Sequence, residues 1–113
     1  MRVLAPLLAS LVLSATAHAL TVDKPPARYD RSHPNLVILE TRHSNVREMC
    51  GRLFGRRNFE TSGKLHACAS VGDGRSPCMV VLPHAGEGIS KHDRSALLRH
   101  ERAHCNGWPG HHP

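Results

Sequence analysis

The apolar positions of this chain form a short helical pattern in its middle. Between residues 46 and 54, apolar side chains recur at spacings of three and four residues, which is the period of one helix face. Asn45 followed by Glu48 has the spacing of a helix start, and Gly55 is a typical helix stop. The pattern therefore predicts a helix over residues 46–54.

A longer helix is predicted near the C-terminus. Ser90 and Asp93 have the spacing of an N-cap and the third helical residue, and Gly107 and Pro109 end the pattern. At about 100° per residue, one broad arc should face inward and the opposite side should face solvent. The outer side consists of Ser95, Arg99 and Arg102, and the inward arc consists of Ala96, Leu97, Leu98, His100, Glu101, Ala103, His104 and Cys105.

Short apolar runs predict strands between and before these helices. Residues 36–39 form a continuous apolar run, which is typical of a buried strand. Residues 64–70 and 78–82 have the character of two further strands, and the turn residues between them, Gly72 to Pro77, favour an antiparallel hairpin. We therefore predict an α+β fold with one helix, a small antiparallel sheet and a C-terminal helix.

The first nineteen residues have the features of a signal peptide. Arg2 is followed by an apolar run over residues 3–15, and Ala17-His18-Ala19 is a small-x-small cleavage site, so the mature chain is expected to begin at Leu20. We expect no membrane span after cleavage, and a periplasmic or secreted location. Residues 20–35 are rich in proline and charge, which predicts an extended lead-in, and residues 36–113 form the predicted domain.

The chain contains four cysteines, all after the predicted cleavage site. An even number in an exported chain of this size predicts two disulfides, because small domains of oxidising compartments are commonly cross-linked. Three pairings are possible. The preferred one joins Cys68 to Cys78 across the hairpin and Cys50 to Cys105 between the helices; a zinc site containing cysteine is the competing interpretation.

The chain is basic, with 15 Lys and Arg against 9 Asp and Glu and a formal net charge of +6. Removal of Arg2 with the signal peptide leaves about +5. We expect no nucleic-acid partner, because the arginines are scattered, aromatic residues are few and no binding module accompanies the charge.

The motif with the clearest chemistry is H-E-x-x-H at His100, Glu101 and His104. Residues four apart on a helix lie on the same face, so both imidazoles can reach one Zn²⁺ ion. The glutamate between them can act as general base on a zinc-activated water molecule. Because the chain has ten histidines, the motif could occur by chance. Its position on the inward arc of a capped helix strengthens the case for metal binding.

A catalytic zinc ion needs a third protein ligand and an open fourth position. No Asp or Glu follows Glu101, so a downstream carboxylate ligand is excluded within this chain. Four histidines remain open for the third position: His111 and His112 downstream, and His84 and His92 upstream. The substrate is expected to be a peptide or peptidoglycan-type amide, and an extended substrate could pair with the edge of the strand at residues 79–82.

The motif resembles that of the zincin metallopeptidases. The resemblance implies zinc binding by His100 and His104 and a catalytic base at Glu101. The longer string H-E-R-A-H-C-N-G-W-P-G-H-H-P is similar to small exported bacterial proteins with H-E-x-x-H-C-N-G-W, some of them associated with conjugal transfer, and this similarity points to His112 as third ligand. The similarity to these exported proteins is specific over residues 97–113.

Two departures leave the zincin branch unassigned. Gly110 stands where metzincins have their third histidine, and the downstream glutamate of the gluzincins is absent. The alternative function is a non-catalytic, disulfide-stapled metal-binding or interaction module of an envelope assembly.

Overall fold

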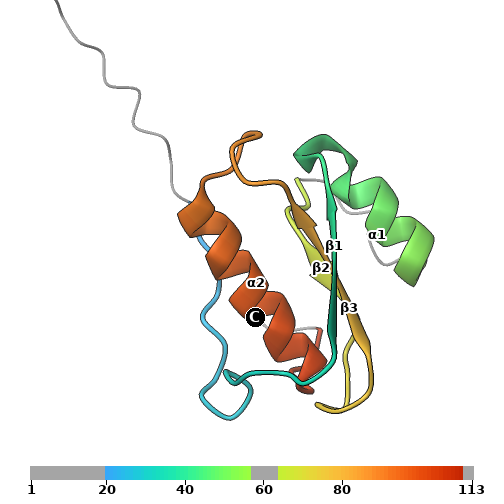
Figure 1. Cartoon of the computed structure of the whole chain (residues 1–113), viewed down its shortest axis with the longest axis vertical. Coiled ribbons are helices and arrows are strands. Elements are labelled where there is room, and N and C mark those ends of the chain that lie inside the picture. Colours follow the sequence, from blue (N-terminus) through green and yellow to red (C-terminus); the bar gives the residue numbers. More distant parts are fainter. Residues whose placement is uncertain (1–19, 57–63, 111–113) are drawn as a thin grey trace, which may run out of the picture.

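A three-stranded mixed sheet lies between two helices (Figure 1). The computed structural model describes residues 20–56 and 64–110. Along the chain, β1 (Leu36–Thr41), a 3₁₀ turn η1 (His43–Asn45) and α1 (Val46–Phe54) are followed by β2 (Cys68–Ala69), β3 (Cys78–Pro83) and α2 (Lys91–Cys105). The strand order β1-β3-β2 places β3 at the centre.

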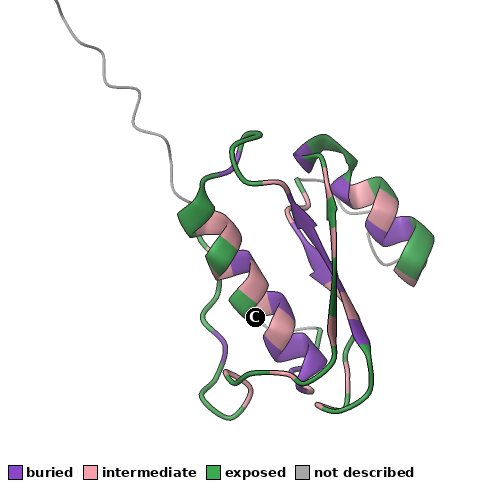
Figure 2. Cartoon of the chain, viewed as in Figure 1, coloured by how far each residue is buried: buried purple, intermediate pink, exposed green. Residues whose placement is uncertain are grey.

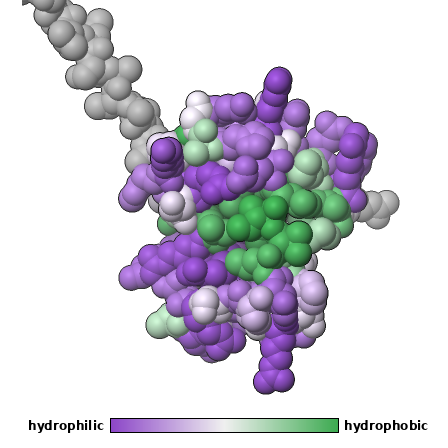
Figure 3. All heavy atoms as spheres, in the orientation of Figure 1, coloured by the Kyte–Doolittle hydropathy of each residue, from purple (hydrophilic) through white to green (hydrophobic). Residues whose placement is uncertain are grey.

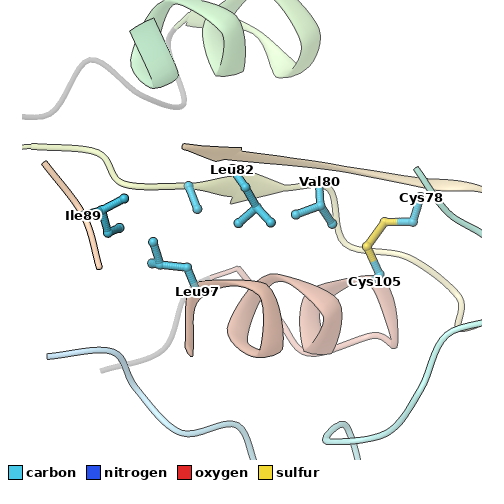
Figure 4. Packing of buried hydrophobic residues seen from close by; sticks show 7 residues of the cluster. Cys78, Val80, Leu82, Ile89, Leu97 and Cys105 are labelled. Carbon is cyan, nitrogen blue, oxygen red and sulfur yellow. A yellow bond between two sulfur atoms is a disulfide. The ribbon is translucent and has the colours of Figure 1, made fainter. Parts of the chain in front are cut away.

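The core has two halves, one on each face of β3. Side chains of a strand point alternately to opposite faces. Val80 and Leu82 therefore pack with Leu97 and Ile89 on the α2 side, as Figure 4 shows, whereas Val81 packs with Val46 on the α1 side. The buried positions of Figure 2 accordingly gather on β3 and on the helix faces turned toward it.

The sheet is only in part the one that the sequence predicts. β2 pairs antiparallel with β3, through Cys68 opposite Val81 and Ala69 opposite Val80, as expected for a hairpin. The strand β2 is, however, only two residues long. β1 runs parallel to β3 over six residue pairs, so the prediction of a purely antiparallel sheet was wrong.

The prediction that residues 36–39 form a buried strand was right about the strand and wrong about its burial. β1 pairs with β3 on one side only, and Val37 and Ile38 are 44% and 41% exposed. Figure 3 shows an apolar band on the face where β1 runs. A continuous apolar run does not distinguish a central strand from an edge strand, because both contain β-branched and aliphatic residues.

Both predicted helices are present with the expected ends. Ser90 caps α2, since its Oγ accepts a hydrogen bond from the Asp93 N–H at 3.0 Å. Gly55 ends α1 with a positive φ of 94°, while Asn45 is the N-cap of α1 by position without a side-chain hydrogen bond. Among the described residues, neither helix has the length and apolar character needed to cross a membrane.

Two disulfides are present, Cys50–Cys68 and Cys78–Cys105, so the preferred pairing predicted from the sequence was wrong. The strand register explains why. Cys68 lies opposite Val81 and therefore faces the same side of the sheet as Val81. Val81 is an odd number of residues from Cys78 along β3, so Cys68 and Cys78 face opposite sides of the sheet. Each cysteine instead pairs with the helix on its own side, as the Cys78–Cys105 bond in Figure 4 illustrates.

Residues 20–35 contain no helix or strand and run beside α2 in the same direction. Asp30 forms ion pairs with Arg99 and Arg102, with an Arg99 Nε to Asp30 Oδ1 distance of 2.8 Å. Asn106 Nδ2 donates to the backbone oxygens of Tyr29 and Arg31 at 3.0 and 2.8 Å. This lead-in is thus fastened to the C-terminal half of α2, where the H-E-x-x-H motif lies.

Candidate metal centre

The two motif histidines converge on the C-terminal half of α2. Their Nε2 atoms are 3.2 Å apart, and their rings meet edge to face with 4.9 Å between centres. Two nitrogen ligands at about 2.0–2.1 Å from a tetrahedral Zn²⁺ ion lie roughly 3.3 Å apart. The spacing of His100 and His104 therefore fits two ligands of one zinc ion.

The orientation of each imidazole is set by a backbone carbonyl. His100 Nδ1 lies 2.9 Å from the Asp23 oxygen, and His104 Nδ1 lies 2.8 Å from the Trp108 oxygen. A carbonyl only accepts hydrogen bonds, so Nδ1 of each ring carries a proton, and in the neutral form of either ring the lone pair is on Nε2. This is the tautomer that binds a metal, with the second nitrogen held by an outer-shell acceptor.

The convergence of the two Nε2 lone pairs has an electrostatic consequence. Two neutral imidazoles in this tautomer repel each other at 3.2 Å unless a proton or a metal ion lies between the nitrogens. The helix geometry keeps them together, since residues four apart are neighbours on its surface. A proton or a cation between the two Nε2 atoms would relieve this repulsion.

Trp108 forms a wall of this centre. Its indole is nearly parallel to the His104 imidazole, at 10° and 4.8 Å between centres, and meets the His100 ring at its edge, also at 4.8 Å. Trp108 is only 7% exposed, so its indole is a packing anchor at the end of α2. The same residue also orients His104 through its carbonyl, which the sequence did not indicate.

Glu101 lies on the buried arc of α2 and is 7% exposed. No hydrogen bond joins its carboxyl group to another of the described residues. Burial raises the pKa of Glu101 to about 8, because desolvation disfavours the charged form. A positive charge held by the neighbouring imidazoles would favour the carboxylate again, so the ionisation of Glu101 and the occupancy of the histidine pair are expected to be linked.

No third side chain that could share an ion with His100 and His104 is found among the described residues. His112 and His111 lie outside them. Within residues 20–56 and 64–110, no group of three or more His, Cys, Asp or Glu side chains is placed to hold a metal ion. Of the upstream alternatives, His84 instead contacts Glu40, with 3.1 Å between Nδ1 and Oε2, and His92 is exposed on the first turn of α2.

Sequence reasoning found the two histidines and Glu101 but missed the groups that orient them. The Asp23 carbonyl belongs to the backbone, 77 residues from His100, and no side-chain pattern marks such an acceptor. Trp108 was visible as a neighbour of the motif, four residues after His104. Spacing alone gave no reason to expect that the indole would stack on that ring.

Comparison with protein-family models, curated proteins and solved structures gives no match to this chain. The functional argument therefore depends on the residues of the centre themselves. They offer an oriented pair of imidazole nitrogens with an indole ring against both imidazoles, and a buried carboxyl group on the same helix turn.

Proposed function

We propose that this chain is a small exported zinc-dependent hydrolase of the zincin metallopeptidase type. In this proposal His100 and His104 hold the zinc ion, His112 is the third ligand and Glu101 is the general base. The observation that carries the proposal is the 3.2 Å approach of two Nε2 atoms whose Nδ1 atoms both face backbone carbonyls. The two disulfides are consistent with an extracytoplasmic location.

The chemistry divides between the ion and the protein. Zinc, when bound, polarises a carbonyl group and lowers the pKa of a water molecule. Glu101 accepts the proton of that water and delivers it to the leaving amine. His100 and His104 contribute fixed lone pairs, and Trp108 limits solvent on one side of the rings.

The substrate class is a peptide or peptidoglycan-type amide. The expectation that an extended substrate would pair with the strand at residues 79–82 was wrong, because β3 is the central strand and both its edges are occupied. The sheet edges that remain for an extended chain are the outer edges of β1 and β2.

A second candidate is a non-catalytic module of an envelope assembly in which the ion braces the end of α2. The burial of Glu101, at 7% exposure, favours it, because a general base must reach a water molecule at the ion. In this second candidate the chain binds the metal ion but catalyses no reaction.

Replacement of Glu101 by Gln separates the two candidates. Gln has nearly the same shape and no charge, so Glu101→Gln should fold at least as stably as the parent, whose glutamate has a pKa raised to about 8 by burial. If the chain is a hydrolase, this variant should keep its zinc and lose amide cleavage by about 100-fold or more. Glu48→Gln is the matched control, because Glu48 lies on the exposed side of α1 in an ion pair with Arg52.

Zinc content tests the ligands directly. His100→Ala should lower the zinc stoichiometry of the purified mature chain, whereas His92→Ala, which removes an exposed histidine from the same helix, should not. A stoichiometry unchanged by His100→Ala would contradict the proposed centre. The same measurement on His112→Ala and His111→Ala identifies the third ligand.

A further inference from the structure

The first residue after the predicted cleavage site lies at the start of α2. The backbone nitrogen of Leu20 is 3.4 Å from Oδ2 of Asp93, and the Leu20 side chain packs against the core between α2 and β3. The two residues are 73 positions apart in the chain. This contact joins the point where the signal peptide is expected to end to the helix that carries the histidine pair.

Cleavage would change the chemistry of this contact. In the uncleaved chain the Leu20 nitrogen is a peptide amide with one N–H and no charge. After cleavage it becomes an α-ammonium group, since an α-amino group ordinarily titrates near pH 8. A hydrogen bond between an ammonium and a carboxylate is roughly twice as strong as its neutral counterpart.

Asp93 is held in place to receive the ammonium group. Its backbone N–H donates to the Ser90 Oγ at 3.0 Å, which fixes the first turn of α2. Burial and the charge of Lys64 lower the pKa of His66, and the Asp93 carboxylate opposes this shift in part. The new ammonium group would therefore meet a carboxylate on a rigid helix turn.

The residues that follow Leu20 connect its contact with Asp93 to the imidazole of His100. Three residues later, the Asp23 oxygen faces Nδ1 of His100. At its far end the lead-in is fastened by Asp30 and Tyr29 to the last turns of α2. Leu20 fastens the near end of the lead-in, where Val22 packs against the same core cluster, so a stronger contact at Leu20 would hold the Asp23 carbonyl more firmly on the imidazole.

We infer that removal of residues 1–19 creates an ion pair between the α-ammonium group of Leu20 and Asp93, and that this pair secures the lead-in which orients His100. The link to metal binding depends on the proposed function, whereas the ion pair itself does not. The mature chain would then bind its metal more tightly than the precursor, and the centre would be completed after export.

A double-mutant cycle tests the ion pair. The four proteins are the mature chain beginning at Leu20, the same chain preceded by Gly-Ser-Gly-Ser, and both forms with Asp93→Asn. The extension moves the ammonium group away without adding a metal ligand. We expect the extension to lower the midpoint of thermal unfolding when Asp93 is present and to change it little in the Asp93→Asn background. Equal shifts in both backgrounds would overturn the inference.

Titration with Co²⁺ tests the link to the centre in the same four proteins. The extended chain should bind Co²⁺ about tenfold more weakly than the mature chain, the lower end of what loss of an outer-shell partner costs. A coupling in thermal stability with equal Co²⁺ affinities would overturn the link to His100. If none of the four proteins binds Co²⁺, the proposed function fails and the link fails with it, while the thermal coupling still decides the ion pair.

Discussion

The indole ring of Trp108 lies almost parallel to the imidazole of His104, with 10° between the planes and 4.8 Å between the ring centres. Trp108 is also the only tryptophan of the chain. Its fluorescence therefore comes from one position, in contact with both histidines. This relationship allows the proposed metal centre to be tested without a catalytic assay.

We expect Cu²⁺ or Co²⁺ to quench the fluorescence of the mature chain strongly at one equivalent, because a paramagnetic ion at the two Nε2 atoms would lie close to the indole. Zn²⁺ should compete with the quencher. His100→Ala should remove quenching at low metal concentration, and His92→Ala should leave it intact. Quenching of equal strength in the His100→Ala variant would locate the ion elsewhere.

A second prediction concerns the turn that docks on the end of α2. Asp73 accepts hydrogen bonds from the backbone N–H groups of Ser76 and Arg75 and from the Ser76 hydroxyl, each at 2.8 Å. These bonds, led by the one from the Ser76 backbone, lower the pKa of Asp73 to about 2 from an ordinary value of 3.8. The ionised form is thus favoured in the folded state.

The sign of the pH dependence follows from this lowered pKa. The stabilisation by Asp73 is complete above its unfolded pKa, near pH 4, and is lost as the pH falls toward about 2. Asp73→Asn should therefore be less stable than the parent at pH 6, and the difference in free energy of unfolding should narrow between about pH 4 and pH 2. Urea unfolding at several pH values measures it, and a difference that stays constant to pH 2 would contradict the assignment.

A third prediction concerns Gly72, whose N–H donates to the His104 oxygen at 2.9 Å. A Cβ atom at this position would lie 2.3 Å from the backbone oxygen of Cys105, which cannot move without disturbing the last turn of α2. Gly72→Ala should cost about 3 kcal/mol or more in stability, the upper end of overpacking. Gly110→Ala is the control, because its nearest contact, Val71, would be at an ordinary 3.9 Å. Equal unfolding midpoints for the two variants would show that the turn can yield.

The parts of the fold that follow from local rules could be predicted from the sequence. The cap at Ser90, the stop at Gly55 and the inward arc of α2 depend on residues a few positions apart, and the structure has all three. The convergence of His100 and His104 belongs to the same class, because one helical turn brings them together.

The rest depends on contacts between distant parts of the chain. The parallel pairing of β1 with β3 and the disulfide partners follow from which face each helix covers, and no local pattern contains that choice. The same is true of the Asp23 carbonyl at His100, because any backbone oxygen of the lead-in could in principle occupy that place.

The two disulfides provide the last prediction, because they close loops of similar length on opposite sides of the sheet. Cys78 and Cys105 are 27 residues apart, and Cys50 and Cys68 are 18 apart. Loop-closure entropy gives each bond about 3–4 kcal/mol, so replacing either pair by serine should lower stability to a similar extent. Only the loss of Cys78–Cys105 should also weaken zinc binding, because Cys105 follows His104 directly and anchors the end of α2 to β3. Zinc affinity is to be measured well below the unfolding midpoint of both variants. Equal losses of affinity would mean that the disulfides act on the histidine pair only through global stability.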